Sequence, residues 1–259
     1  MSDRRLLALQ VLAPIVFTVV LFAGWQMLCK AFSIAPTVLP APTDVFAALW
    51  RYRGPIASNA GVTLWTTLAG FLLATAFGLA LGIAAGWHRL AYAALYPVLV
   101  GFNSVPKVAV VPVLILWFGI GEVPAVITAF LISFFPIVVN VATGLASTEP
   151  ELEDVLRALG ASKLDVMRKV GIPRSLPYFF GSLKVAITLA FVGAVVSETV
   201  GANRGIGHLM LAAQADFQVP LIFAGLVALA FEGIAMYAAM ALLESRMTGW
   251  AQRSGFAQR

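Results

Sequence analysis

The sequence predicts an all-α membrane protein with six transmembrane helices, on two observations. Of its 259 residues, 61% are hydrophobic and 11% are charged, whereas a soluble domain carries about 25% charged residues. Several apolar runs also reach the roughly 20 residues that a helix needs to cross the hydrocarbon core of a bilayer. Because so little charge could not coat a large soluble core, the chain is expected to lie within a membrane.

The apolar runs predict spans at roughly 9–29, 61–86, 92–118, 123–146, 176–200 and 219–243. The first run follows Arg4 and Arg5, but it is too long for a signal peptide and no small-residue cleavage site follows it. We therefore expect an uncleaved span. A single cysteine, Cys29, and two histidines exclude an internal disulfide and a metal site built from several Cys or His side chains.

The basic residues predict which side of the membrane each segment faces. With the N-terminus inside, eleven Lys and Arg residues fall in cytoplasmic segments and four in outer segments, while Lys107 lies in a span and Lys184 near the start of the fifth. Cytoplasmic loops carry an excess of Lys and Arg. The net charge of +5 is therefore interpreted as an orientation signal rather than a sign of nucleic-acid binding. Both termini are expected in the cytoplasm, in a multi-pass protein of the inner membrane.

The segment between the first two spans is expected to lie on the outer membrane surface. Pro36, Pro40 and Pro42 prevent a helix at its start. Thr43 or Asp44 should then cap a short amphipathic helix. One side of this helix is expected to carry four apolar residues, which are Val45, Phe46, Leu49 and Trp50.

The second span has a small residue at every fourth position, which predicts close packing against another helix. A smooth ridge of this kind lets a second backbone approach, so the helix should be buried among helices rather than face lipid. The ridge consists of Gly70, Ala74, Gly78, Gly82 and Gly86.

The third span is expected to be interrupted. A lysine so deep in a membrane must face water, a partner or a cavity, and proline-broken helices are tolerated where they are buried or line a cavity. The span is interpreted as a gate or pathway wall, or else as a segment in which the lysine pairs with a carboxylate or extends outward. The residues concerned are Pro97, Pro106, Pro112, Asn103, Ser104 and Lys107.

Polar residues in the remaining spans complete the candidates for a translocation pathway. Glu232 lies near the centre of the sixth span, where an ionisable residue is a functional candidate. Lys107 is considered as its partner, and the alternative is a protonated carboxyl group hydrogen-bonded to a neighbour. Asn140 is interpreted mainly as an interhelical hydrogen bond, and the glycines at 201, 205 and 207 are expected to shape a turn. The full set of candidates is Asn103, Lys107, Asn140, Ser197, Glu198 and Glu232.

Residues 147–176 form a polar segment in an otherwise apolar chain, and they predict two short helices that meet at a glycine. Thr148 and Glu151 form a capping box for the first helix. Gly160 is expected to end this helix in a left-handed conformation. The apolar face of the first helix consists of Leu152, Val155, Leu156 and Leu159.

The second short helix is expected to begin at Ser162, with Asp165 three residues later. Pro173 and Pro177 are expected to end it and to start the fifth span. A rigid corner between two helices suits a groove in a partner protein, although by physics alone it could equally lie flat on the membrane.

This corner resembles the cytoplasmic EAA loop of binding-protein-dependent ABC transporter permeases. Asp154 stands at the glutamate position of that motif, Gly160 at its glycine and Pro173 at its terminal proline, with larger residues, Val155 and Leu156, replacing the two alanines. The core of the motif is matched by Arg157, Ala158, Gly160, Ala161 and Ser162. The segments 39–42 (LPAP), 105–109 (VPKVA) and 115–119 (ILWFG) resemble the nitrate, sulfonate and taurine subgroup.

The resemblance implies the architecture of a type I ABC importer permease. It implies a homodimer, two cytoplasmic ATP-binding subunits that contact the corner, and an extracytoplasmic binding protein that delivers the solute. ATP and Mg²⁺ would bind the partner ATPase, since this chain has no Gly-x4-Gly-Lys-Ser/Thr loop, and no enzymatic activity is expected of it. Lys107 slightly favours an anion, so the expected solute is a sulfonate, nitrate or carboxylate, or a vitamin precursor.

The resulting organisation has three parts. Residues 1–60 form a first span with an outer amphipathic segment, 61–245 form the permease core with the coupling loop 147–176, and 246–259 form a cytoplasmic tail. Two alternatives remain open. One is an ion-coupled secondary carrier that uses Glu232 and Lys107, although no convincing repeat relates the two halves. The other is a membrane scaffold that recruits a partner through the corner without transporting a solute.

Overall fold

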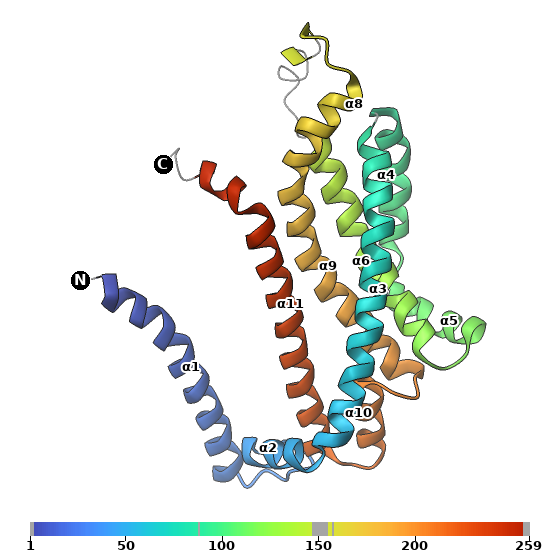
Figure 1. The fold of residues 1–259 in the computed structure, drawn as a ribbon. Helices are drawn as coiled ribbons and strands as arrows, with labels where there is room; N and C mark the ends of the chain where they lie inside the picture. Colours follow the sequence, from blue (N-terminus) through green and yellow to red (C-terminus); the bar gives the residue numbers. More distant parts are fainter. Residues whose placement is uncertain (1–2, 88, 147–154, 157, 256–259) are drawn as a thin grey trace.

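A computed structural model describes residues 3–87, 89–146, 155–156 and 158–255. Across these ranges the chain forms helices, turns and loops, and no strand. Five helices are long and apolar enough to cross a membrane, or six if one bent pair counts as a single span. The all-α, six-span prediction is therefore confirmed. In Figure 1 the spans form an elongated bundle, with α8 at one end and α2 and α10 at the other.

Helix α1 (Asp3–Ala31) stands apart from the bundle and approaches it only near its C-terminal end. There the ring of Trp25 lies 5.8 Å from that of Phe22 and 5.9 Å from that of Phe223 in α11. Most apolar side chains of α1 that the structure describes are exposed. An apolar helix with so little protein contact is suited to a lipid environment.

Helix α2 (Pro42–Arg51) is the predicted amphipathic helix, and the bundle covers part of its apolar side. The Asp44 carboxylate accepts a hydrogen bond from the Ala41 backbone N–H at 3.3 Å, so Asp44 caps the helix. Val45 and Ala48 are buried against α11, but Phe46 and Trp50 are 52% and 73% exposed. The four predicted apolar residues fall on one side of the helix, but the bundle covers only part of that side, because Phe46 and Trp50 remain exposed.

The centre of the bundle consists of α3 (Arg53–Trp87), α6 (Glu122–Ala146) and α9 (Ile172–Gly201). The small-residue ridge of α3 packs directly against α6, as predicted. A Cβ atom added at Gly78 would lie 2.9 Å from Ile137 Cβ, and one added at Gly82 would lie 2.7 Å from Val141 Cβ. Larger residues on this ridge would push the two helices apart.

The third span is broken, as predicted, into α4 (Arg89–Ser104), the short 3₁₀ helix η1 (Lys107–Val110) and α5 (Val111–Phe118). The two parts are bent by 72°. Of the three prolines only Pro106 lies at the break, where the residue before it is disfavoured from helical conformation. Pro97 lies inside α4 and Pro112 in the first turn of α5.

The fifth span begins earlier than predicted. Helix α8 (Lys163–Val166), the π-helix η2 (Met167–Gly171) and α9 follow one another without a loop. Pro173 lies in the first turn of α9 and Pro177 inside it, so the prediction that these prolines end the second short helix is wrong. The π turn explains the difference, because the Ile172 N–H bonds to the Met167 carbonyl and the register of the helix shifts just before the proline.

Two helices complete the described chain. The short α10 (Ile206–Ala215) follows the turn after α9, and the long α11 (Val219–Gly255) returns along the bundle beside α9 and α3. In Figure 1 the N-terminal end of α1 and the C-terminal end of α11 both point away from the end that carries α2 and α10.

Candidate functional site

The corner at Gly160 has the local geometry that the sequence predicts. Gly160 has a φ of +87°, and the Ala161 N–H bonds to the Leu156 carbonyl at 3.0 Å, which is a glycine-ended helix terminus. Ser162 and Asp165 form a reciprocal cap. The Asp165 N–H donates to Ser162 Oγ at 3.2 Å, and the Ser162 N–H donates to Asp165 Oδ2 at 3.1 Å.

The corner is exposed, and its surface is partly apolar. Ala158, Gly160 and Ser162 are exposed, and Ala161 is half-buried. The side chains of Val155, Leu159 and Leu164 are 56%, 79% and 51% exposed. Exposed apolar side chains on a rigid turn are suited to docking into a partner groove. The predicted cap at Thr148 and Glu151 lies outside the described residues, as do Asp154 and Arg157.

The base of the corner is joined to the core of the bundle. Val166 is buried, and Met167 packs against the core cluster. Gly144, near the end of α6, packs so closely on α9 that an added Cβ atom would lie 3.0 Å from Ser175 Cβ. A force on the corner would therefore reach α6 and α9 directly, because closely packed elements move as units.

Glu198 lies in a buried hydrogen-bond network at the start of α10. Its side chain is 1% exposed. The Glu198 Oε2 atom accepts hydrogen bonds from Thr63 Oγ1 at 2.9 Å and from the Gly207 N–H at 3.0 Å, and Thr66 Oγ1 lies 3.4 Å from Oε1. A carboxylate is favourable beside the free N–H groups of a helix N-terminus.

The same network holds the other backbone N–H groups of the turn. The Gly205 N–H donates to Asn59 Oδ1 at 2.8 Å, and the Ile206 N–H donates to Thr63 Oγ1 at 2.9 Å. The first N–H groups of α10 are thus bonded to side chains from α3 and α9 rather than to water. Gly205 has a φ of +110° and shapes the turn as predicted, whereas the other two glycines of that prediction lie in the helices, at the end of α9 and in α10.

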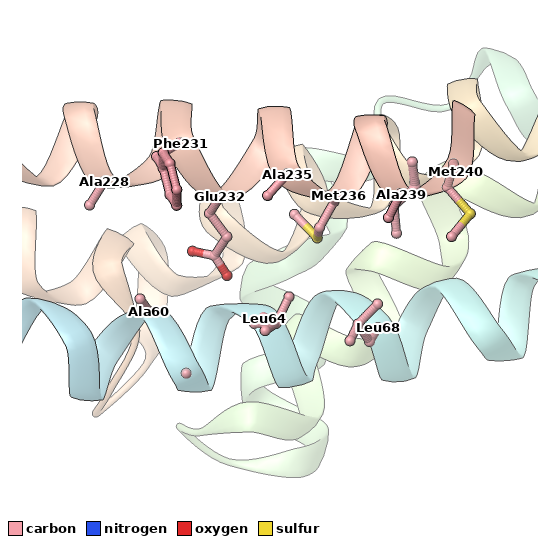
Figure 2. A pocket seen from close by; sticks show the side chains of 12 residues that line it. Ala60, Leu64, Leu68, Ala228, Phe231, Glu232, Ala235, Met236, Ala239 and Met240 are labelled. Atoms are coloured by element: carbon pink, nitrogen blue, oxygen red, sulfur yellow. The ribbon is translucent and has the colours of Figure 1, made fainter. Parts of the chain in front are cut away.

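Glu232 lines a separate, apolar cavity between α3 and α11. The cavity has a volume of about 530 Å³ and is shown in Figure 2. The Glu232 side chain is 9% exposed, and neither carboxyl oxygen has a hydrogen-bond partner among the described residues. The remaining lining side chains are apolar, and they come from Ala60, Gly61, Leu64, Leu68, Ile187, Ala228, Phe231, Ala235, Met236, Ala239 and Met240.

Lys107 lies at the break of the third span, as the first residue of η1, and bonds to the preceding helix α4. Its Nζ donates to the Asn103 carbonyl at 2.5 Å and to Asn103 Oδ1 at 2.9 Å, and it lies 5.6 Å from the centre of the Phe102 ring. Lys107 thus caps the C-terminal end of α4. Because Lys107 bonds to Asn103 and the Glu232 carboxyl has no partner, the described structure does not contain the pair considered from the sequence.

The two remaining candidates for the translocation pathway are Asn140 and Ser197. Asn140 Nδ2 donates to the Pro136 carbonyl at 2.8 Å, which is a bond within α6, so the interpretation as an interhelical bond is wrong. The four-residue spacing explains this, because the side chain can reach back one turn. Ser197 is 1% exposed, and its hydroxyl has no partner in the described part of the chain.

Two features were not predicted from the sequence, namely the α3 residues of the Glu198 network and one ion pair. Asn59, Thr63 and Thr66 lie at i, i+4 and i+7 on α3, and this spacing puts polar groups on one helix face, which was the available signal. Lys184 Nζ of α9 lies 2.5 Å from Glu244 Oε2 of α11. That pairing joins two helices distant in sequence, and no local pattern indicates it.

Comparison with known proteins agrees with the family resemblance seen in the sequence. Residues 74–249 match the family model described as binding-protein-dependent transport system inner membrane component. The chain is 31% identical to the formylaminopyrimidine transport permease protein ThiX of Halalkalibacterium halodurans, over 94% of this chain and 98% of the relative. It is 35% identical to the riboflavin transport system permease protein RibX of Chloroflexus aurantiacus, over 89% and 87%.

A third relative and one solved structure extend this comparison. The putative aliphatic sulfonates transport permease protein SsuC of Bacillus subtilis is 30% identical, over 89% of this chain and 84% of the relative. An inward-facing conformation of the MetNI methionine ABC transporter contains a chain with the same fold, at a TM-score of 0.61 and 20% identity, covering 75% of this chain and 96% of that one.

Proposed function

The chain belongs to the family of inner membrane components of binding-protein-dependent transport systems, and on that premise we propose that its Gly160 corner is where a cytoplasmic ATPase engages it. As an ABC importer permease it is a multi-pass integral protein of the inner membrane. The proposed assembly contains two copies of this chain, two ATP-binding subunits and an extracytoplasmic substrate-binding protein. ATP and Mg²⁺ are held by the ATP-binding subunits.

The observation that carries this proposal is the exposed corner joined to α9 without a loop. Leu159 and Leu164 present apolar surface beside the left-handed Gly160. Helix α8 continues through η2 into α9, so a displacement of the corner would be transmitted along one helical rod. ATP-driven closure of the partner subunits would move two such rods and open the pathway alternately to either side, as a rigid-body motion.

The proposed orientation places the corner and both termini in the cytoplasm. The excess of Lys and Arg in the corresponding segments supports this orientation. The opposite end, with α2 and α10 (Figure 1), would then face the binding protein. That end also has a hollow of about 410 Å³ between α2 and α11, lined in part by Asp44 and Arg51. A polar surface of the binding protein could contact these two charged groups.

The proposed solute is a small organic molecule similar to those in the names of the relatives. Those names include aliphatic sulfonates, riboflavin and formylaminopyrimidine. The expectation of an anion depended on Lys107, whose ammonium group already bonds to Asn103. A vitamin precursor is therefore the preferred solute.

The docking role is tested by Gly160→Glu in the reconstituted permease and ATPase. The variant is expected to insert normally but to lose most ATPase binding and solute uptake, because a charged side chain occupies the corner. Gly119→Glu is a matched control, since Gly119 also has a positive φ, of +80°, and no atom within 4 Å of an added Cβ. It should keep ATPase binding. Uptake by Gly160→Glu at the wild-type rate would show that the corner is not the docking site.

A further inference from the structure

The cavity between α3 and α11 contains a carboxyl group with no hydrogen-bond partner. Glu232 is 91% buried, since 9% of the residue is exposed, and neither oxygen is paired within the described chain. In Figure 2 its carboxyl group points from α11 across toward α3, near Ala60 and Leu64. A buried polar group without a partner costs free energy, so a molecule that supplied a hydrogen-bond donor here would be favoured.

The rest of the lining determines what else such a molecule must be. Leu64, Leu68, Phe231 and Met236 supply an apolar surface, and among the lining residues that the structure describes only Glu232 is polar. Apolar pockets with one or two placed polar groups hold small organic ligands, and about 530 Å³ lies within the usual range of such pockets. An anion would meet a carboxyl group and no basic side chain in this cavity.

The depth of Glu232 argues against the amine of a lipid headgroup. Glu232 lies 13 residues after Val219, the first residue of α11, which is about 20 Å along the helix axis. The apolar span that contains it, Val219–Thr248, has 30 residues, so Glu232 lies near the middle of the span and far from either surface of a hydrocarbon core about 30 Å thick. A phospholipid amine lies at the surface of the bilayer, well away from this depth.

We propose that this cavity is a binding site within the transport route for an uncharged or cationic solute, largely apolar and carrying an N–H donor such as an aromatic amine or aminoheterocycle. The proposal rests on the proposed transport function in taking the transported solute as the occupant. Both Glu232 oxygens are covered by surrounding protein atoms, so the donor would meet the carboxyl group after a change of the Glu232 rotamer.

The experiment measures binding to the full chain in phosphatidylcholine nanodiscs without ATPase. The probe is tritiated 2-amino-4-phenylpyrimidine, with empty nanodiscs as the blank and two unlabelled competitors. One competitor, 4-phenylpyrimidine, has the same shape without the donor, and the other, 4-phenylpyrimidine-2-carboxylate, is an anion. We expect saturable binding, with 4-phenylpyrimidine competing about tenfold more weakly or worse and the carboxylate more weakly still.

Three variants test whether the preference for the amino compound over 4-phenylpyrimidine arises in this cavity. Glu232→Leu should bind the amino compound and 4-phenylpyrimidine equally, while Glu122→Gln, a carboxyl group at the start of α6 outside the cavity lining, should keep the wild-type preference. Ala235→Phe should fill the cavity and abolish binding. If Ala235→Phe fails to fold, Ala235→Leu in the same assay should weaken binding at least about tenfold.

Several results would overturn the proposal. These are no saturable binding above empty nanodiscs, equal affinity of the wild type for the amino compound and 4-phenylpyrimidine, or an unchanged preference in Glu232→Leu. Displacement of the probe by added phosphatidylethanolamine would assign the cavity to lipid and would also overturn it. Because the assay contains no ATPase, a negative result leaves the docking role of Gly160 intact, and failure of the Gly160→Glu test leaves this binding result intact.

Discussion

The carboxylate of Glu198 lies directly against the backbone of Gly205, with no room for a side chain at position 205. The contact joins the end of α9 to the start of α10, and the Gly207 N–H and Thr63 hydroxyl bond to the same carboxylate. Because Glu198 belongs to α9 and its buried carboxylate accepts hydrogen bonds from α3 and α10, it fixes the three helices relative to one another.

Gly205→Ala should destabilise the protein by at least about 2 kcal/mol, because the new Cβ atom collides with the Glu198 carboxylate at a position whose φ is +110°. Chemical denaturation in mild detergent measures the change. Gly101→Ala is the control, since nothing lies within 4 Å of an added Cβ there, and it should unfold like the wild type. Equal stability of both variants would contradict the observed contact.

Thr63→Val should cost about 1–3 kcal/mol, because it removes the partner of the Ile206 N–H and one donor to Glu198 while keeping the side-chain shape. The same denaturation assay measures it. Thr188→Val removes an exposed hydroxyl that bonds only to the Lys184 carbonyl of its own helix, so it should change stability little. A similar loss from both substitutions would show that burial of the network contributes nothing specific.

Gly70→Ala should destabilise the protein by about 1–3 kcal/mol through overpacking. The added Cβ atom would lie 2.5 Å from Ala129 Cβ and 2.7 Å from the Val126 carbonyl oxygen, and backbone atoms of α6 cannot move aside locally. Gly54→Ala, at the start of the same helix with nothing within 4 Å of its Cβ, provides the comparison. The relevant readout is the difference in melting temperature between the two variants.

Lys184 and Glu244 form an ion pair between α9 and α11 at 2.5 Å, with side chains 26% and 17% exposed. Lys184→Glu alone should place two carboxylates together and lower both stability and uptake. The double variant Lys184→Glu with Glu244→Lys should recover most of the lost stability. The ion pair itself is expected to account for about 0.5–1 kcal/mol of that recovery. Absence of any recovery in the double variant would mean that the pair does not hold the two helices together.

The features that could be predicted from the sequence depend on neighbours within a few residues. At the Gly160 corner the Ala161 N–H bonds to a carbonyl five residues earlier, and Ser162 and Asp165 cap each other across three residues. The ridge on α3 was predictable for the same reason, since its four-residue repeat defines one helix face. The break at Pro106 likewise follows from the covalent structure of proline.

The predictions that failed concern choices between two locally acceptable arrangements. On α2 the sequence could not show that Val45 is buried while Phe46 and Trp50 are exposed, because apolar pattern alone does not distinguish a protein neighbour from lipid. Pro173 was expected to end a helix, but the π turn before it accommodates the ring within a continuous helix. Asn140 was given an interhelical partner although a carbonyl of its own helix lay within reach.

By itself the sequence determined the class of protein, the number of spans, the sites where the chain turns and the corner at Gly160, because hydropathy, proline and glycine act locally. Only the tertiary structure decided what surrounds the intramembrane carboxyl groups. Glu198 finds its partner Thr63 across 135 positions of sequence, whereas Glu232 lies in an apolar cavity without one. The two residues have the same chemistry, and the difference arises because helix packing determines which distant side chains reach each of them.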